Sequence, residues 1–142
     1  MNIRFFLIFS FLVIGFAGIL SAEELTLLYW GDFQSQNNPV VTEKDGRTFE
    51  SGGAALLSGM INQINSRIDR VISFDVGNHF PGSPISSITK GASQIEILNR
   101  IGVDIFVPGS HEFDFGWKSL LDVSRKAKFD ILLANVISQE TG

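Results

Sequence analysis

Residues 108–116 carry the side chains best suited to acid–base or metal chemistry in this chain. They place His111, Glu112 and Asp114 within four positions, directly after the mostly apolar run of residues 103–107. A buried strand that leads into glycine and then into titratable side chains is typical of a site at a strand's carboxyl end. Open α/β sheets usually bind their ligands there. Read alone, the segment is equally compatible with a polar loop and a helix cap.

Polar side chains also follow two earlier apolar, β-prone runs, residues 25–30 and residues 70–76. Because the carboxyl ends of parallel strands meet at one edge of a sheet, we expect all three loops to converge. The polar residues at the three strand ends are Asp32 with Gln34, Asn78 with His79, and Ser110 with His111.

The spacing of apolar residues predicts an α/β fold in which about four parallel strands alternate with three helices and right-handed crossovers. The predicted strands are residues 25–30, 70–76, 103–107 and 130–136, and the predicted helices are residues 54–67, 90–100 and 116–128. Gly102 is the expected C-cap of the second helix. Residues 35–51 are predicted to form a polar loop, and residues 81–84 a tight loop.

The N-terminus has the order of a secretory signal peptide. A basic start is followed by 16 uncharged residues, 5–20, and by the small residues Ser21 and Ala22. As a helix, these 16 residues would reach about 24 Å, which is short of the roughly 30 Å hydrocarbon core. The prediction is a cleaved signal peptide over residues 1–22, an exported chain, and a periplasmic or extracellular location. An uncleaved membrane anchor is the alternative.

Composition excludes several function classes. The 142 residues include no cysteine, so disulfides, thiolate metal sites and cysteine nucleophiles are ruled out. Removing residues 1–22 takes away one basic residue, Arg4, and leaves 10 basic and 15 acidic residues, a net charge of −5. The acidic surplus is scattered and no basic stripe is present, which argues against nucleic-acid binding.

Five segments resemble, in order, motifs of the 5′-nucleotidase family within the calcineurin-like metallophosphoesterases. The segments are residues 27–34 (LLYWGDFQ), 51–55 (SGGAA), 75–86 (DVGNHFPGSPIS), 109–116 (GSHEFDFG) and 133–136 (LANV). The resemblance implies that residues 23–142 form a truncated N-terminal part of a metallophosphoesterase domain. It also implies two divalent metal ions, such as Zn²⁺ or Mn²⁺, and hydrolysis of nucleotides or other small phosphate esters. Relatives add further histidine ligands and a nucleotide-binding domain beyond the region that this chain covers.

The resemblance assigns four metal-binding positions. Asp32 would bind the first ion and Asn78 would bridge the two ions, while Gln34 and Ser110 would complete the sites. Three of these positions depart from the family, which has His at position 34, Asp at 78 and Asn at 110. A bridging anion offsets the repulsion between two cations and lowers the pKa of the attacking water, and a neutral amide supplies no such charge. We expect the three replacements to weaken metal binding on the order of a hundredfold or more.

The remaining polar residues receive individual interpretations. By resemblance, His111 paired with Asp114 would stabilise the leaving group. His79 is interpreted as a solvated loop histidine, with a rescue metal ligand as the alternative. Asp75 is expected to bond loop amides, and Glu112 to contact loop backbone. The two tryptophans, Trp30 and Trp117, are expected to be core residues rather than a base-stacking platform.

The sequence thus favours an exported 5′-nucleotidase-like phosphoesterase that is truncated and impaired. Two alternatives stay open, namely a non-catalytic binding or interaction relative that has lost its metal ions, and a gene remnant. The outer side of the last strand needs a neighbour, which predicts aggregation or a partner chain that completes the sheet.

Overall fold

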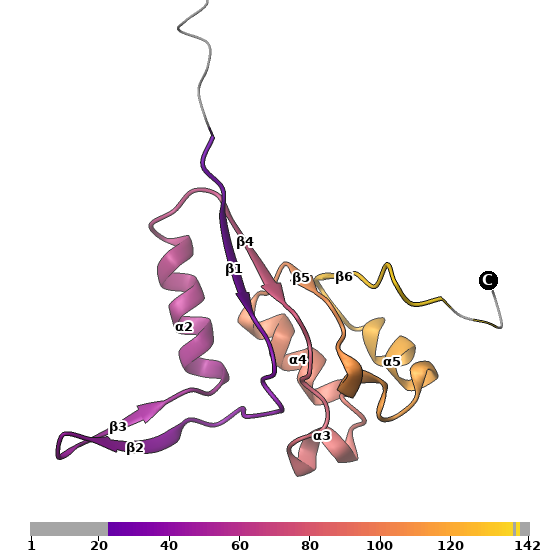
Figure 1. Ribbon diagram of the computed structural model, residues 1–142, viewed down its shortest axis with the longest axis horizontal. Coiled ribbons are helices and arrows are strands. Elements are labelled where there is room, and N and C mark those ends of the chain that lie inside the picture. The colour runs from indigo at the N-terminus through magenta and orange to yellow at the C-terminus, as the bar shows by residue number, and fades with distance from the viewer. Residues whose placement is uncertain (1–22, 138, 140–142) are drawn as a thin grey trace, which may run out of the picture.

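The computed structural model describes residues 23–137 and residue 139 (Figure 1). The predicted signal peptide, residues 1–22, lies outside the described residues. Within the described part, no helix combines the length and apolar character needed to cross a membrane.

The centre of the fold is a four-stranded parallel sheet, which confirms the predicted class. Its strands, in spatial order, are β1 (Thr26–Trp30), β4 (Val71–Asp75), β5 (Ile105–Phe106) and β6 (Asp130–Ile131). The register aligns Trp30, Asp75, Phe106 and Ile131 across the sheet, so the loops after β1, β4 and β5 leave the same edge. The last two strands are shorter than the predicted ranges 103–107 and 130–136.

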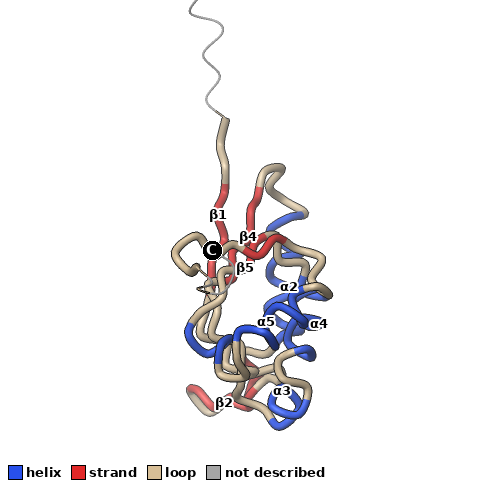
Figure 2. Tube along the Cα trace, turned by 90° about the vertical axis from the view of Figure 1, so that its right-hand side faces the viewer, coloured by secondary structure: helices blue, strands red, loops and turns tan. Residues whose placement is uncertain are grey.

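Three helices connect these strands and lie together on one side of the sheet (Figure 2). They are α2 (Ala54–Asn65), α4 (Ala92–Ile101) and α5 (Trp117–Ser124). Gly102 ends α4 in the left-handed region, with φ 81°, and its N–H donates to the carbonyl of Leu98, as predicted for a C-cap. The third helix ends at Ser124, four residues before the predicted end at 128.

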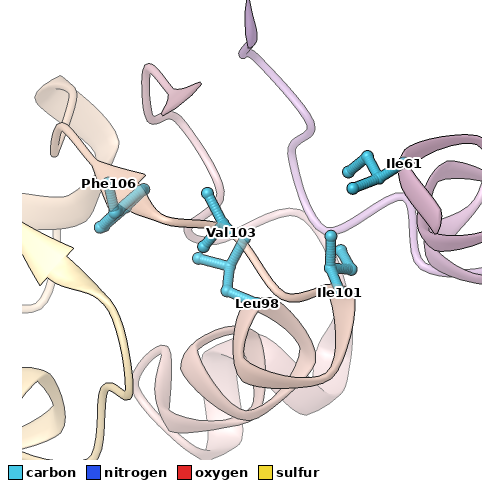
Figure 3. Packing of buried hydrophobic residues seen from close by; sticks show 5 residues of the cluster. All are labelled: Ile61, Leu98, Ile101, Val103 and Phe106. Carbon is cyan, nitrogen blue, oxygen red and sulfur yellow. The ribbon is translucent and has the colours of Figure 1, made fainter. Parts of the chain in front are cut away.

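The core lies between this helical layer and the sheet. One cluster joins Ile61 of α2, Leu98 and Ile101 of α4, Val103, and Phe106 of β5 (Figure 3). A second cluster lies beneath α4 and α5 and comprises Phe80, Ile95, Leu120 and Val123. Full burial of a side chain of this size contributes about 1.5–3 kcal/mol. These contacts fix α4 against the strands that carry the site loops.

Two predicted loops contain regular structure. Residues 35–51 hold an antiparallel hairpin of β2 (Val40–Lys44) and β3 (Arg47–Ser51). Its turn residues Asp45 and Gly46 both have positive φ, 53° and 69°, because this Asp-Gly pair forms the two-residue turn that matches strand twist. The prediction of an irregular loop was wrong, because β-prone residues such as Val40, Val41 and Phe49 flank the Asp-Gly turn and allow the two sides to pair as strands.

The structure has four α-helices in its described part rather than the three predicted. The additional helix is α3 (Pro84–Ile88), which directly follows the predicted tight loop of residues 81–84. Ser83 caps it by accepting a hydrogen bond from the N–H of Ser86, and Pro84 occupies its first turn. A helix of five residues is too short to show a helical apolar period in the sequence.

The opposite face of the sheet carries apolar side chains that no described helix covers. Leu27 and Tyr29 are 55% and 79% exposed, whereas the alternating residues Leu28 and Trp30 pack into the first core cluster. Sheets made only of parallel strands normally have both faces covered. The uncovered face is therefore an apolar surface suited to a further layer of protein.

The substitution Tyr29→Lys should reduce both self-association and the binding of a hydrophobic dye, because it places a charge on the apolar face of the sheet. The side chain is largely exposed, so we expect the free energy of unfolding to change by only about 0.5 kcal/mol. Sedimentation velocity, dye fluorescence and denaturant unfolding measure these effects. Gln63→Lys, on an exposed position of α2, is the charge-matched control and should leave dye binding unchanged. Equal effects of the two exchanges would contradict the interpretation of this face.

Candidate functional site

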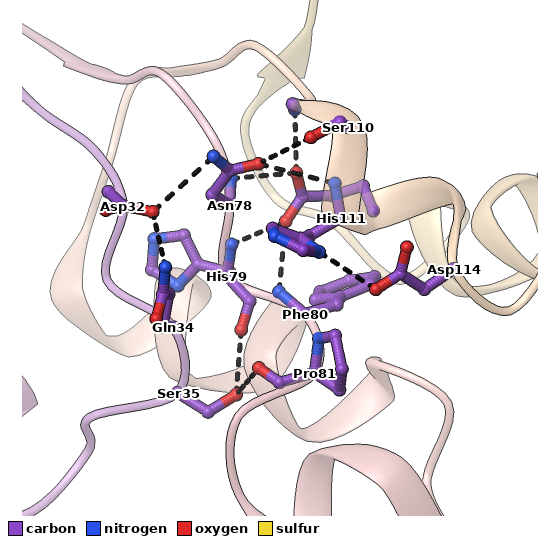
Figure 4. A network of polar contacts seen from close by, with 12 residues as sticks. Asp32, Gln34, Ser35, Asn78, His79, Phe80, Pro81, Ser110, His111 and Asp114 are labelled. Carbon is purple, nitrogen blue, oxygen red and sulfur yellow. Dashed lines mark hydrogen bonds and ion pairs between the residues drawn. The ribbon is translucent and has the colours of Figure 1, made fainter.

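The three predicted loops converge at the carboxyl edge of the sheet (Figure 4). One carboxylate oxygen of Asp32 accepts hydrogen bonds from Gln34 Nε2 at 2.8 Å and from Asn78 Nδ2 at 3.5 Å. The amide oxygen of Asn78 in turn lies 3.5 Å from Ser110 Oγ and 3.3 Å from the backbone nitrogen of His111. The structure therefore brings together all four predicted metal positions and the candidate catalytic histidine.

The backbone at this edge adopts unusual conformations. Asp32, Gln34 and Asn78 all have left-handed φ values, 57°, 48° and 60°. Asn and Asp tolerate this region better than most residues. The conformations are held by backbone hydrogen bonds of 2.8 Å from Asp32 N to Gly77 O and from Gln34 N to Asn78 O. At Gly77, with φ 88°, an added Cβ would lie 2.3 Å from the nitrogen of Gly109, so only glycine fits where the second and third loops cross.

Glu112 joins the second and third loops through its buried carboxylate. The two oxygens accept backbone N–H groups from Asn78 at 2.8 Å, His79 at 2.6 Å, Phe80 at 3.1 Å and Gly109 at 2.7 Å. Hydrogen bonds to an ionised acceptor are about twice as strong as neutral ones. This confirms the predicted contact of Glu112 with loop backbone.

His111 and Asp114 form an exposed pair at the opening of the site. The distance from His111 Nδ1 to Asp114 Oδ2 is 2.9 Å, and the side chains are 47% and 42% exposed. The hydrogen bond that the Asp114 carboxylate accepts from the His111 ring raises the pKa of His111 above its ordinary value of 6.5. The negative charges of Asp114, Glu112 and Asp32 act in the same direction. These interactions favour the protonated imidazole more than in an isolated histidine, and a protonated imidazole can donate a proton to a bound ligand.

His79 differs from its prediction. It is fully buried rather than solvated, and its Nε2 lies 2.5 Å from Asp75 Oδ2. Asp75 also accepts the N–H of Gly77 at 3.0 Å, as expected of a residue that bonds loop amides. A polar loop in the sequence suggested solvent exposure, but Phe33 and Phe106 enclose the ring.

The two tryptophans behave differently from each other. Trp30 is partly buried and packs against the first core cluster, as predicted. Trp117 is 38% exposed at the start of α5, so its prediction as a core residue was wrong. The ammonium group of Lys118 lies 5.1 Å from the centre of the Trp117 ring. A tryptophan in the first turn of a short helix can lie beside the core rather than in it.

Sequence reasoning missed Phe33 and Ser35 as residues that shape the site. Ser35 is buried, and its hydroxyl donates to the carbonyl oxygens of His79 at 2.7 Å and Pro81 at 2.9 Å. Phe33 stacks on His79. Its place in a loop after the first strand gave no periodic signal, because side chains alternate regularly only within a strand. Ser35 offered no signal within a polar segment.

Comparison with known proteins adds independent support. No protein-family model matches the chain. The mouse (Mus musculus) 5′-nucleotidase is 33% identical over 120 residues, which are 82% of this chain and 21% of that protein. A snake venom 5′-nucleotidase from Gloydius brevicauda is 30% identical over 80% of this chain and 20% of its own length. The crystal structure of a 5′-nucleotidase precursor from Thermus thermophilus superimposes with a TM-score of 0.75 and 26% identity, over 82% of this chain and 23% of that chain. The chain belongs to the 5′-nucleotidase family. It spans about one fifth of the length of the curated relatives that it matches.

The 5′-nucleotidase family is one of metallophosphoesterases, and this implies divalent metal ions. The residues present do not fit a two-metal centre. Among residues 23–137 and 139, no group of three or more His, Asp or Glu side chains is placed to hold a metal ion. Asp32 is the only anionic side chain at the four predicted positions, and the amide nitrogens of Gln34 and Asn78 point at its carboxylate. Donors thus lie at one of the two carboxylate oxygens of the only anionic side chain among these positions.

The titration of His111 tests the electrostatics of this 5′-nucleotidase-type site. We expect its pKa, measured by NMR, to lie above 6.5 and to fall towards that value in Asp114→Asn, which keeps the side-chain shape but removes the charge. Because folding raises this pKa, the stabilising effect of the pair is fully present below pH 6.5 and is lost as the pH rises through the folded value.

Asp122→Asn is the matched control, since Asp122 is an exposed acid that pairs with Arg125 on α5. It should leave the His111 titration unchanged. A His111 pKa that is insensitive to Asp114→Asn would show that the pair does not exist in solution.

Proposed function

We propose that this chain is an exported 5′-nucleotidase-type phosphoesterase unit that hydrolyses nucleotide phosphate esters, and that its activity is impaired relative to its relatives. The observation that carries the proposal is the His111–Asp114 pair, held at 2.9 Å where the three loops converge. The relatives support the reaction class, because those named above are 5′-nucleotidases.

The chain's own residues supply the proton that the leaving group needs in such a reaction. In hydrolysis, the oxygen of water forms a bond to phosphorus, the bond between phosphorus and the ester oxygen breaks, and the departing ester oxygen needs a proton. The protonated imidazole of His111 donates that proton, while Asp114 holds the ring in orientation and favours its charged form. A positioned general acid contributes about 10²–10⁴-fold in rate.

Impairment follows from the chemistry of the metal positions. A two-metal centre requires anionic bridging oxygen, and position 78 carries an amide that hydrogen bonds to Asp32 and Ser110. The proposal is therefore slow hydrolysis compared with an intact 5′-nucleotidase, with weak binding of Zn²⁺ or Mn²⁺ at Asp32, Gln34, Asn78 and Ser110.

Location and partners form the rest of the proposal. The basic start, apolar run and small residues of the N-terminus favour export to the periplasm or the extracellular space, by a cleaved signal peptide or an uncleaved membrane anchor. The uncovered sheet face, with Leu27 and Tyr29 exposed, favours a partner chain that completes the domain. The ligand is a nucleotide or another small phosphate ester.

Turnover of a nucleoside 5′-monophosphate tests the reaction. The purified chain with Mn²⁺ or Zn²⁺ should release phosphate slowly but measurably, and His111→Ala should lower the rate by about a hundredfold because the leaving oxygen loses its acid. Lys128→Ala, an exposed position outside the site, is the control and should retain the rate.

Metal binding tests the impairment separately. The triple substitution Gln34→His, Asn78→Asp and Ser110→Asn introduces the residue types that the resemblance assigns to the family. It should raise the affinity for Mn²⁺, measured by calorimetry, by about a hundredfold. The control carries the same three exchanges together with Asp32→Asn, and it should lose that gain. Absence of turnover in both the natural chain and the restored variant would reject the phosphoesterase proposal in favour of a non-catalytic relative.

A further inference from the structure

Asp75 and His79 are a buried ionisable pair that the proposed chemistry does not use. Both side chains are fully buried, and they lie four residues apart on either side of Gly77 and Asn78. Asp75 ends β4, and its second oxygen accepts the N–H of Gly77. The pair therefore ties both ends of the turn that presents Asn78 to the site.

The ring of His79 also contacts the other two strand ends. Phe33, which lies between Asp32 and Gln34 in the first loop, stacks on it with centroids 5.0 Å apart and an angle of 20°. Phe106, the last residue of β5, meets it edge-on at 6.0 Å. Aromatic pairs of this kind contribute beyond the area that they bury.

The backbone of His79 is bonded to the first and third loops as well. Its N–H donates to Glu112 at 2.6 Å, and its carbonyl accepts the hydroxyl of Ser35 at 2.7 Å. His79 is thus the residue at which all three loops meet, below the layer formed by Asp32 and Asn78 (Figure 4).

The contacts of His79 hold the site loops in conformations that are unfavourable by themselves. The left-handed conformations of Asp32, Gln34 and Asn78 cost energy, and such conformations persist only where surrounding contacts over-determine them. A metal ion bound by these residues would supply that constraint, but their side chains do not fit a two-metal centre. The contacts of His79 supply it from within the protein.

We propose that the Asp75–His79 pair, together with Phe33, is a positioning unit that holds Asp32 and Asn78 in place without a metal ion. Neither His79 nor Asp75 touches a ligand in this role; both act through the loops that they fix. The role does not depend on the proposed hydrolysis, so it can be tested in the absence of substrate.

The test is amide hydrogen exchange by NMR on the full chain in the presence of a chelator. The reporters are the N–H groups of Gln34 and Asn78, which donate to Asn78 O and Glu112. The reference is the N–H of Leu98 in the core helix α4. His79→Gln keeps a donor for Asp75 but removes the ring, and Phe33→Leu removes the stacking partner while it keeps the buried pair.

Both substitutions should accelerate hydrogen exchange at the amides of Gln34 and Asn78 by about tenfold or more. The hydrogen-exchange rate of the Leu98 amide should stay within about threefold of its original value, because local opening is separate from global unfolding. Phe49→Leu on the β2–β3 hairpin is the matched control and should change none of the three amides. Unchanged exchange at both reporters in the two variants would overturn the proposal. Equal acceleration of hydrogen exchange at all three amides would also overturn the proposal, because the pair would then contribute to global stability alone. Loss of the fold in both variants would count as this result.

Discussion

The buried carboxylate of Glu112 is the interaction on which the site geometry depends. It draws four backbone N–H groups from two loops onto its two oxygens, and one carboxylate thereby fixes the position of Asn78 relative to Gly109. A buried charge is tolerated only where it is fully hydrogen-bonded, because its removal from water is costly. The loops must therefore keep these four groups in place for the chain to fold as it does. The backbone N–H of His79 donates one of the four bonds, which links this carboxylate to the layer beneath the site.

The residues at the four predicted metal positions make hydrogen bonds to one another. Gln34 and Asn78 donate to Asp32, and Asn78 accepts from Ser110 and His111. Gln34, Asn78 and Ser110 are neutral groups, and each of them is hydrogen-bonded to a neighbouring side chain of the site. The site therefore combines the loop framework of a 5′-nucleotidase with a polar network that needs no cation for its own cohesion, and the exposed His111–Asp114 pair lies above it.

The two faces of the sheet differ in how they are covered. Helices α2, α4 and α5 cover one face (Figure 2), whereas Leu27 and Tyr29 project from the other. The chain matches about one fifth of its relatives' length, and in the part that the structure describes the three helices lie against one face of the sheet.

The sequence by itself determined the class of the fold, the convergence of three loops and the pairing of His111 with Asp114. The first two follow from local patterns, because apolar runs and glycine positions define strands and because parallel strands share a carboxyl edge. The pairing was implied by the resemblance to the 5′-nucleotidase family. The hairpin at residues 40–51 lay within reach of sequence reasoning through its Asp-Gly turn. Only the tertiary structure decided the role of His79, since burial depends on Phe33 and Phe106, which are distant in sequence. It also decided the exposure of Trp117 and the direction of the amides at Gln34 and Asn78. These properties depend on which side chains meet across loops, and no spacing along one chain segment encodes that.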